Sequence, residues 1–236
     1  MTEQTGTIEA DMAAFGMTMP PDFPRATYLK IELHCRPRIP PDGPLKPGWD
    51  QYAFAWNAIR YRFRAMADHD DLFRASIGAA GHELRYVQER ELFEFFASGF
   101  SCLETCAYGL CFLGSIDNAA TFDTRKPRDV TLTTFTSTLE KLHPTLPLTQ
   151  RLIGLRTDPA FSDWKECRHV LTHRGAPGRI IEASVGGPPR PPDDDIWKLR
   201  EIPLNDRTTL SRRQWLAATL DSVLRDAEPF VASVIH

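Results

Sequence analysis

The stretch DPAFSDWKECRHVLTHRGAPGR, residues 158–179, has the clearest helix boundaries in the chain and its densest set of functional side chains. Asp158 is suited to cap a helix, and Pro159 suits the first helical position, where its missing N–H is not needed. Gly175 is a residue type that ends helices, and Pro177 prevents the helix from resuming. The sequence therefore predicts a helix of about four turns here.

The C-terminal part of this predicted helix carries the charged and imidazole side chains Glu166, Arg168, His169, His173 and Arg174. Positions 166, 169 and 173 follow an i, i+3, i+7 spacing, so their side chains share one stripe. Arg168 and His173 differ by about 140° around the helix axis and by about 7.5 Å along it. Long side chains at these two positions can still converge above a groove formed with a second helix. The rest of the chain is interpreted as the scaffold that holds the helix of residues 158–174.

The segment CRHVLTHRG resembles the signature of the HEPN superfamily, small α-helical proteins often found in prokaryotic toxin–antitoxin and defence systems. That signature is an arginine, a polar residue, a few further residues and a histidine, late in a helix of a bundle. Arg168, His169 and His173 match these positions one by one, and the helical layout is compatible over residues 49–174 and the C-terminal helix. The chain has a second Arg-x4-His match, Arg64 to His69, which lacks the polar residue after the arginine.

The resemblance implies a metal-independent endoribonuclease, with no cofactor, acting at a cleft between two copies of the chain. Arg168 would hold a phosphate, because a guanidinium fork matches phosphate oxygens. His173 would serve as general acid or base, since histidine titrates near neutral pH. His169 would orient the phosphate or His173, with Glu166 and Arg174 in support. The expected partners are RNA or a nucleotide, a second copy of the chain, and an antitoxin protein.

Other interpretations of these residues remain open at this point. Glu166, His169 and His173 also offer three metal ligands on one face, although Val170 stands where helix-borne zinc proteases have a glutamate. The protein could instead be a binding module without catalysis, in which the helical groove holds a nucleotide or the apolar surface of Leu92 to Leu113 pairs with a partner protein. Arg168 could also form an ordinary salt bridge with Glu166 or Asp163.

The bulk composition favours a cytosolic protein with a real core. The chain has 236 residues, and 42% of them are hydrophobic. It has 28 basic and 31 acidic residues, so its overall charge gives no indication of nucleic-acid binding. Five cysteines without paired spacing argue against a disulfide framework. The N-terminus lacks the basic region of a signal peptide. The apolar run from Leu92 to Ile116 contains Glu94 and Glu104, which favours a core helix over a membrane span.

Periodicity predicts a mainly α fold, an HEPN-like helical bundle with a small antiparallel β appendage. Residues 1–48 are expected to be irregular with one strand at 27–35, where apolar and polar residues alternate. Residues 49–236 are expected to form the helical domain, with a β hairpin inserted at about 179–203. The helical patterns lie at 49–67, 72–77, 82–114, 131–142, 148–155 and 158–174, with a break near 68–71 and a final helix capped by Ser211. The hairpin would pair 179–185 with 196–202, and Pro229 should kink or split the last helix.

Overall fold

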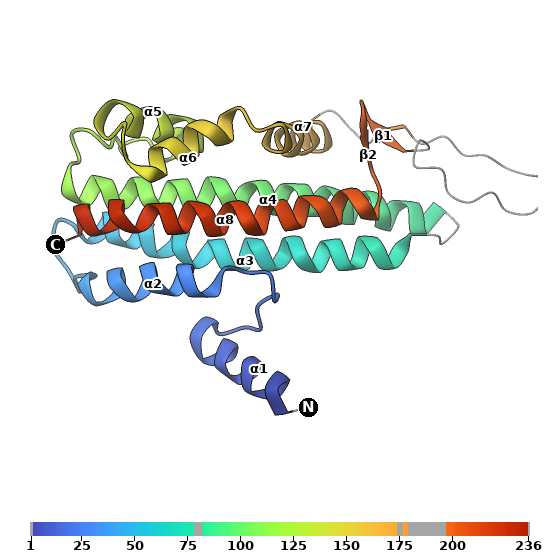
Figure 1. Cartoon of the computed structure of the whole chain (residues 1–236), viewed down its shortest axis with the longest axis horizontal. Coiled ribbons are helices and arrows are strands. Elements are labelled where there is room, and N and C mark those ends of the chain that lie inside the picture. Colours follow the sequence, from blue (N-terminus) through green and yellow to red (C-terminus); the bar gives the residue numbers. More distant parts are fainter. Residues whose placement is uncertain (1, 78–81, 174–176, 179–196, 236) are drawn as a thin grey trace, which may run out of the picture. The chain divides into compact units, whose positions relative to one another are not determined.

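The computed structural model describes residues 2–77, 82–173, 177–178 and 197–235, and their fold is mainly α, as predicted (Figure 1). The long helices are α3 (Lys46–Ser76), α4 (His82–Asp117) and α8 (Asp206–Val234). The shorter ones are α1 (Thr2–Phe15), α2 (Arg25–Cys35), α5 (Leu132–Leu142), α6 (Pro147–Arg156) and α7 (Pro159–His173), with single 3₁₀ turns at Arg36–Arg38 and Pro127–Asp129.

The chain divides into two compact units. Unit 1 comprises Met1–Arg64, Ser101–Arg156 and Ala217–His236, and unit 2 comprises Ala65–Phe100 and Thr157–Leu216. The boundaries between the units lie inside α3, α4 and α8, so each of these three long helices contributes residues to both units. Each unit is described below by itself.

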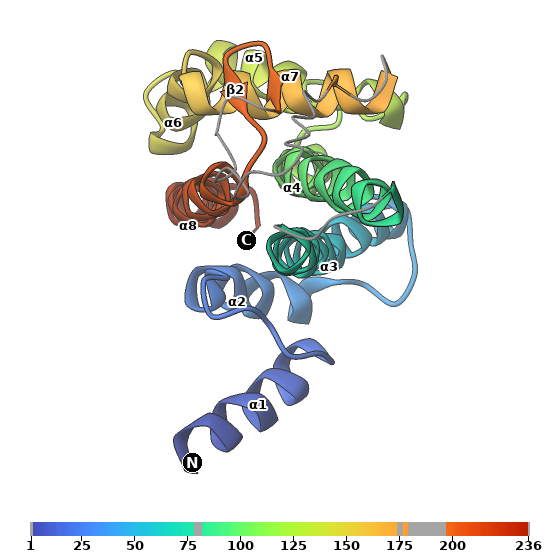
Figure 2. The ribbon, with the colours of Figure 1, turned by 90° about the vertical axis from the view of Figure 1, so that its right-hand side faces the viewer.

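In unit 1, α2 packs beside the first half of α3 through aromatic side chains (Figures 1 and 2). Tyr28 stacks on Trp56 with ring centroids 5.3 Å apart, and its hydroxyl donates to the Trp56 carbonyl at 2.9 Å. The strand predicted for residues 27–35 is therefore wrong. The residues that α2 buries are Tyr28, Ile31 and Cys35, at helical spacing, whereas Leu33 is 65% exposed.

Two further predictions near the N-terminus are corrected. Residues 2–15, expected to be irregular, form α1. The break expected near residues 68–71 is absent, because α3 continues to Ser76. Asp70 is fully buried in this part of α3 and receives a hydrogen bond from Arg213 at 3.3 Å, so a long-range partner stabilises the acidic run inside the helix.

The described β structure is a two-residue hairpin in unit 2. β1 (Lys198–Leu199) pairs antiparallel with β2 (Ile202–Pro203), and Arg200 at the turn has a φ of 55°. The predicted strand at 196–202 is thus wrong in detail, since its described part folds back on itself. Its predicted partner, residues 179–185, lies outside the described residues.

Local capping explains where the other helices begin. Thr131 caps α5 in a reciprocal capping box with Thr134, in agreement with the helix predicted there. α8 begins earlier than predicted: the Asn205 side chain accepts a hydrogen bond from the Thr208 N–H at 2.9 Å, and Ser211 lies inside the helix. Pro229 lies within α8 and does not split it.

Among the described helices, α4 alone is long and apolar enough to cross a membrane, within Glu83–Asp117. Of its most apolar window, 72% is buried inside the structure. Burial of this extent is typical of a core helix, so the length and composition of α4 are only weak evidence for a membrane span.

Candidate functional site

The helix that carries the motif, α7, begins where the sequence predicts. An Asp158 carboxylate oxygen accepts a hydrogen bond from the Ala160 N–H at 2.7 Å, the contact of an N-cap residue, and Pro159 is the first helical residue. The other Asp158 oxygen accepts from the Trp215 indole N–H at 3.2 Å. This one aspartate therefore caps α7 and links it to the first turns of α8 within unit 2.

A glycine on α4 fixes the position of α7. A Cβ atom at Gly99 would lie only 2.3 Å from Trp164 Cη2, so the Trp164 ring occupies the space that any larger residue would need. Trp164 is 1% exposed, and its ring stacks on Phe95 and meets Phe96 edge-on, with both centroids 5.0 Å away. A close helix crossing with interlocked aromatic rings sets where the following turns of α7 lie.

This crossing brings Arg168 over an aromatic ring of α4. The Arg168 guanidinium carbon lies 5.8 Å from the centroid of the Phe100 ring, within cation–π distance. Phe100 in turn stacks on Phe161, with ring centroids 5.7 Å apart. Within the described part of the chain Arg168 makes no ion pair with a carboxylate, and its side chain is partly exposed.

The two carboxylates that could have neutralised Arg168 have other partners. Glu166 pairs with Arg200 of the hairpin at 2.9 Å. Asp163 pairs with Arg212 of α8. The ordinary salt-bridge interpretation of Arg168 is therefore wrong for both proposed partners.

The remaining predicted site residues are placed only in part. His169 is partly exposed on α7. His173 is the last residue of α7, and its side chain lies outside the described residues, as does all of Arg174. In the described ranges no group of three or more His, Cys, Asp or Glu side chains could hold a metal ion. The ion pair of Glu166 with Arg200 engages one of the three ligands that the metal hypothesis requires.

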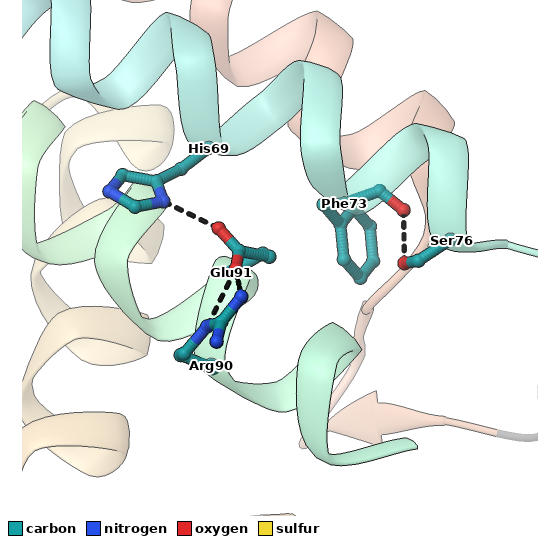
Figure 3. A network of polar contacts seen from close by, with 5 residues as sticks. All are labelled: His69, Phe73, Ser76, Arg90 and Glu91. Atoms are coloured by element: carbon teal, nitrogen blue, oxygen red, sulfur yellow. Dashed lines mark hydrogen bonds and ion pairs between the residues drawn. The ribbon is translucent and has the colours of Figure 1, made fainter. Parts of the chain in front are cut away.

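Unit 2 contains a second polar cluster, outside the motif of α7. Figure 3 shows the Glu91 carboxylate of α4 between His69 of α3 and Arg90, its own neighbour. His69 Nδ1 lies 2.6 Å from one Glu91 oxygen, and Arg90 Nε donates to the other at 2.7 Å. The same view shows Ser76 donating to the Phe73 carbonyl at the end of α3, at 2.6 Å.

Burial and hydrogen bonding act against each other on Glu91. The residue is 1% exposed, and burial alone would raise its pKa. The hydrogen bonds from His69 and Arg90 outweigh that effect and hold the pKa of Glu91 below its ordinary value. A buried, ionised carboxylate thus orients a partly exposed imidazole. The sequence signals were the charge of Glu91 at the edge of an apolar run and the place of His69 in the second Arg-x4-His match, and neither identifies the two residues as partners.

Cys167 precedes the motif arginine but is not positioned to react. It is fully buried, and burial raises the pKa of its thiol to about 12, with further increases from the negative charges of Asp163 and Glu166. A thiol of that pKa carries almost no thiolate at neutral pH. Cys167 is therefore a packed core residue.

Comparison with known proteins supplies no family for this chain. No family model matches it, and no curated protein or solved structure shows significant similarity to it.

Proposed function

We propose that this protein is an HEPN-like, metal-independent endoribonuclease, a toxin or defence component that acts on RNA. One observation carries the proposal: Arg168, in the position of the motif arginine, is supported by the Phe100 ring and has no carboxylate partner among the described residues. A buried or neutralised arginine would have been useless as a phosphate contact. The five free, buried cysteines are compatible with a reducing cytoplasm.

The proposed reaction is transfer within the RNA backbone. The ribose 2′-hydroxyl attacks the adjacent phosphorus, and the bond from phosphorus to the 5′-oxygen breaks, leaving a 2′,3′-cyclic phosphate and a 5′-hydroxyl. His173 takes the proton of the 2′-hydroxyl, and a second His173, from the partner copy of a homodimer, gives a proton to the leaving oxygen. Arg168 stabilises the charge on the phosphorane oxygens. His169 orients the phosphate or His173.

Cleavage of a mixed-sequence RNA in the presence of EDTA tests the proposal. Wild type should cleave, and Arg168→Ala and His173→Ala should each lose about 100-fold or more of the rate. Arg168→Lys should recover only part, because an ammonium lacks the guanidinium fork. Arg225→Ala, which removes an exposed arginine of α8 far along the sequence, is the matched control and should cleave normally.

The outcomes separate the alternatives. Equal cleavage by wild type and both alanine variants would remove the proposed roles. RNA binding that depends on Arg168 without cleavage would favour the non-catalytic binding module. Near-stoichiometric metal in the purified protein, with activity abolished by EDTA, would favour the metal site of Glu166, His169 and His173.

A further inference from the structure

The part of α3 that belongs to unit 1 carries an exposed aromatic ring between two hollows. Phe54 is 69% exposed and lines both of them. One hollow has a volume of about 500 Å³ and is also lined by Tyr61, Arg60 and Arg36. The other has a volume of about 340 Å³, lies along α3 and α4, and is also lined by Arg62. Because Phe54 is common to both hollows, these five side chains form one surface, which is called the α3 surface below.

Tyr61 supplies a second exposed ring on the same stripe of α3. It is 54% exposed, and its i, i+7 spacing from Phe54 corresponds to about 10.5 Å of helix rise. The guanidinium carbon of Arg60 lies 5.7 Å from the centroid of the Tyr61 ring, within cation–π distance. An exposed polar side chain, Asn57, stands between the two rings in the sequence. The rings are therefore two separate flat faces rather than one apolar patch.

Two arginines of the α3 surface are oriented by hydrogen bonds to neutral groups. Arg60 donates from Nε to the side-chain oxygen of Asn57 at 2.6 Å. Arg62, which is exposed, donates to the Ser101 carbonyl at 3.1 Å. Neither arginine forms an ion pair with a carboxylate in the part of the chain that the structure describes. The hydrogen bonds therefore fix the guanidinium groups without neutralising their charge.

The carboxylates that line the two hollows, Glu32 and Glu104, offset little of this charge. Glu104 accepts a hydrogen bond from the Leu132 N–H at 2.8 Å, at the N-terminus of α5, where the positive end of the helix dipole compensates its charge. One oxygen of Glu32 is buried, and burial raises the pKa of Glu32, although the charges of Arg60 and Arg36 act in the opposite direction. A ligand that approaches the α3 surface therefore meets a positive field.

We propose that the α3 surface binds single-stranded RNA. Bases of the strand stack on Phe54 and Tyr61, and its phosphates bind Arg36, Arg60 and Arg62. Separate aromatic faces beside fixed guanidinium groups are typical of single-strand binding, which depends little on sequence because every base has a face that can stack. A protein partner would instead favour a continuous apolar core, which the polar side chain between the two rings interrupts. This contact lies outside the α7 motif and does not require the cleavage proposed for it.

Fluorescence anisotropy with labelled 2′-O-methyl oligoribonucleotides tests the α3 surface. These strands have no 2′-hydroxyl that can attack, so they stay intact whether or not the protein cleaves RNA. The Arg168→Ala chain is used throughout, so that the α7 motif does not contribute to binding. In that chain Phe54→Ala and Tyr61→Ala should each weaken binding about tenfold. Arg62→Ala should reduce the slope of log K against log salt by about 0.7.

Tyr86→Ala is the matched control. Tyr86 is a 58% exposed tyrosine of α4 in unit 2, and the guanidinium carbon of Arg90 lies 5.8 Å from its ring centroid, so its local chemistry is that of Tyr61. Its removal should leave the affinity unchanged. Tyr61→Phe keeps the ring and should bind as the parent chain does. Unfolding temperatures establish that each variant is folded.

The outcomes decide between RNA and other ligands. A single strand should bind about tenfold tighter, or more, than a duplex of the same sequence, because paired bases are not free to stack on side chains. Equal affinity for the two forms, or no effect of Phe54→Ala and Tyr61→Ala, would overturn the proposal. Polyglutamate that displaces the strand as well as RNA does would overturn it in favour of an acidic protein partner. Failure of the wild type to cleave RNA, with binding to the α3 surface retained, would remove only the function proposed for α7.

Discussion

Replacing Gly99 with alanine tests the geometry on which the candidate site depends. The added Cβ would lie 2.3 Å from Trp164 Cη2, 2.5 Å from Trp164 Cζ3 and 3.1 Å from Met66 Cγ. The Trp164 ring is held by Phe95 and Phe96, so it cannot move aside without breaking both ring contacts. Overpacking of this severity costs about 3 kcal/mol, at the upper end of the usual range.

The intrinsic preference of helices for alanine offsets part of that cost, by about 1 kcal/mol. The net expectation for Gly99→Ala is a loss of about 2 kcal/mol in the free energy of unfolding, or about 4–8 °C in Tm for a chain of this size. Urea denaturation followed by circular dichroism measures the free energy, and calorimetry measures Tm.

Gly154 of α6 provides the matched control. A Cβ there would meet no atom within 4 Å, so Gly154→Ala should stabilise the protein by about 0.5–1 kcal/mol. Adding Trp164→Phe to Gly99→Ala should be less destabilising than the sum of the two single changes, because the smaller ring removes the clash. If Gly99→Ala is as stable as wild type, or the double variant is strictly additive, then Trp164 does not dock against Gly99 and Arg168 is not held as described.

Two further predictions concern buried titratable groups. The lowered pKa of Glu91 means that its stabilising effect is present above the unfolded-state pKa of about 4.3 and is lost as pH falls through the lower folded value. Glu91→Gln should therefore lower the free energy of unfolding by about 1–3 kcal/mol at pH 7, and this difference should shrink between pH 5 and pH 3 in urea titrations. Glu83→Gln, an exposed change on the same helix, is the control and should show neither effect. A difference between Glu91→Gln and wild type that does not depend on pH would contradict the lowered pKa of Glu91. All five thiols are buried, and burial raises the pKa of Cys106 and Cys111 to about 12. Native protein at pH 8 should therefore react with a thiol reagent no faster than it unfolds. Fast labelling of any cysteine would show that this cysteine is accessible in the native state.

The helices with strong local signals follow from the sequence alone. α7 has an aspartate cap and a proline in the first position, and α5 has a threonine cap; both begin within a residue of the predicted positions. α4 is predicted because its apolar residues continue over many turns. Local hydrogen bonds and the period of the backbone determine such elements, so nearby residues suffice to predict them.

Tertiary contacts decide the elements whose local pattern is ambiguous. The alternation at 29, 31 and 33 is compatible with a strand, but the contacts of Tyr28 with Trp56 select the helix. The acidic run near Asp70 predicts an interruption of the helix. The run lies inside α3 instead, where Arg213, 143 positions away, donates a hydrogen bond to Asp70.

The same division applies to the candidate sites. The sequence identifies Arg168 as a motif residue, but only the packing of Trp164 against Gly99 places it over Phe100, and only the pairing of Glu166 with Arg200 leaves it without that carboxylate. These contacts join residues that lie far apart in the sequence, so they depend on how the helices pack, which a pattern along one segment does not encode.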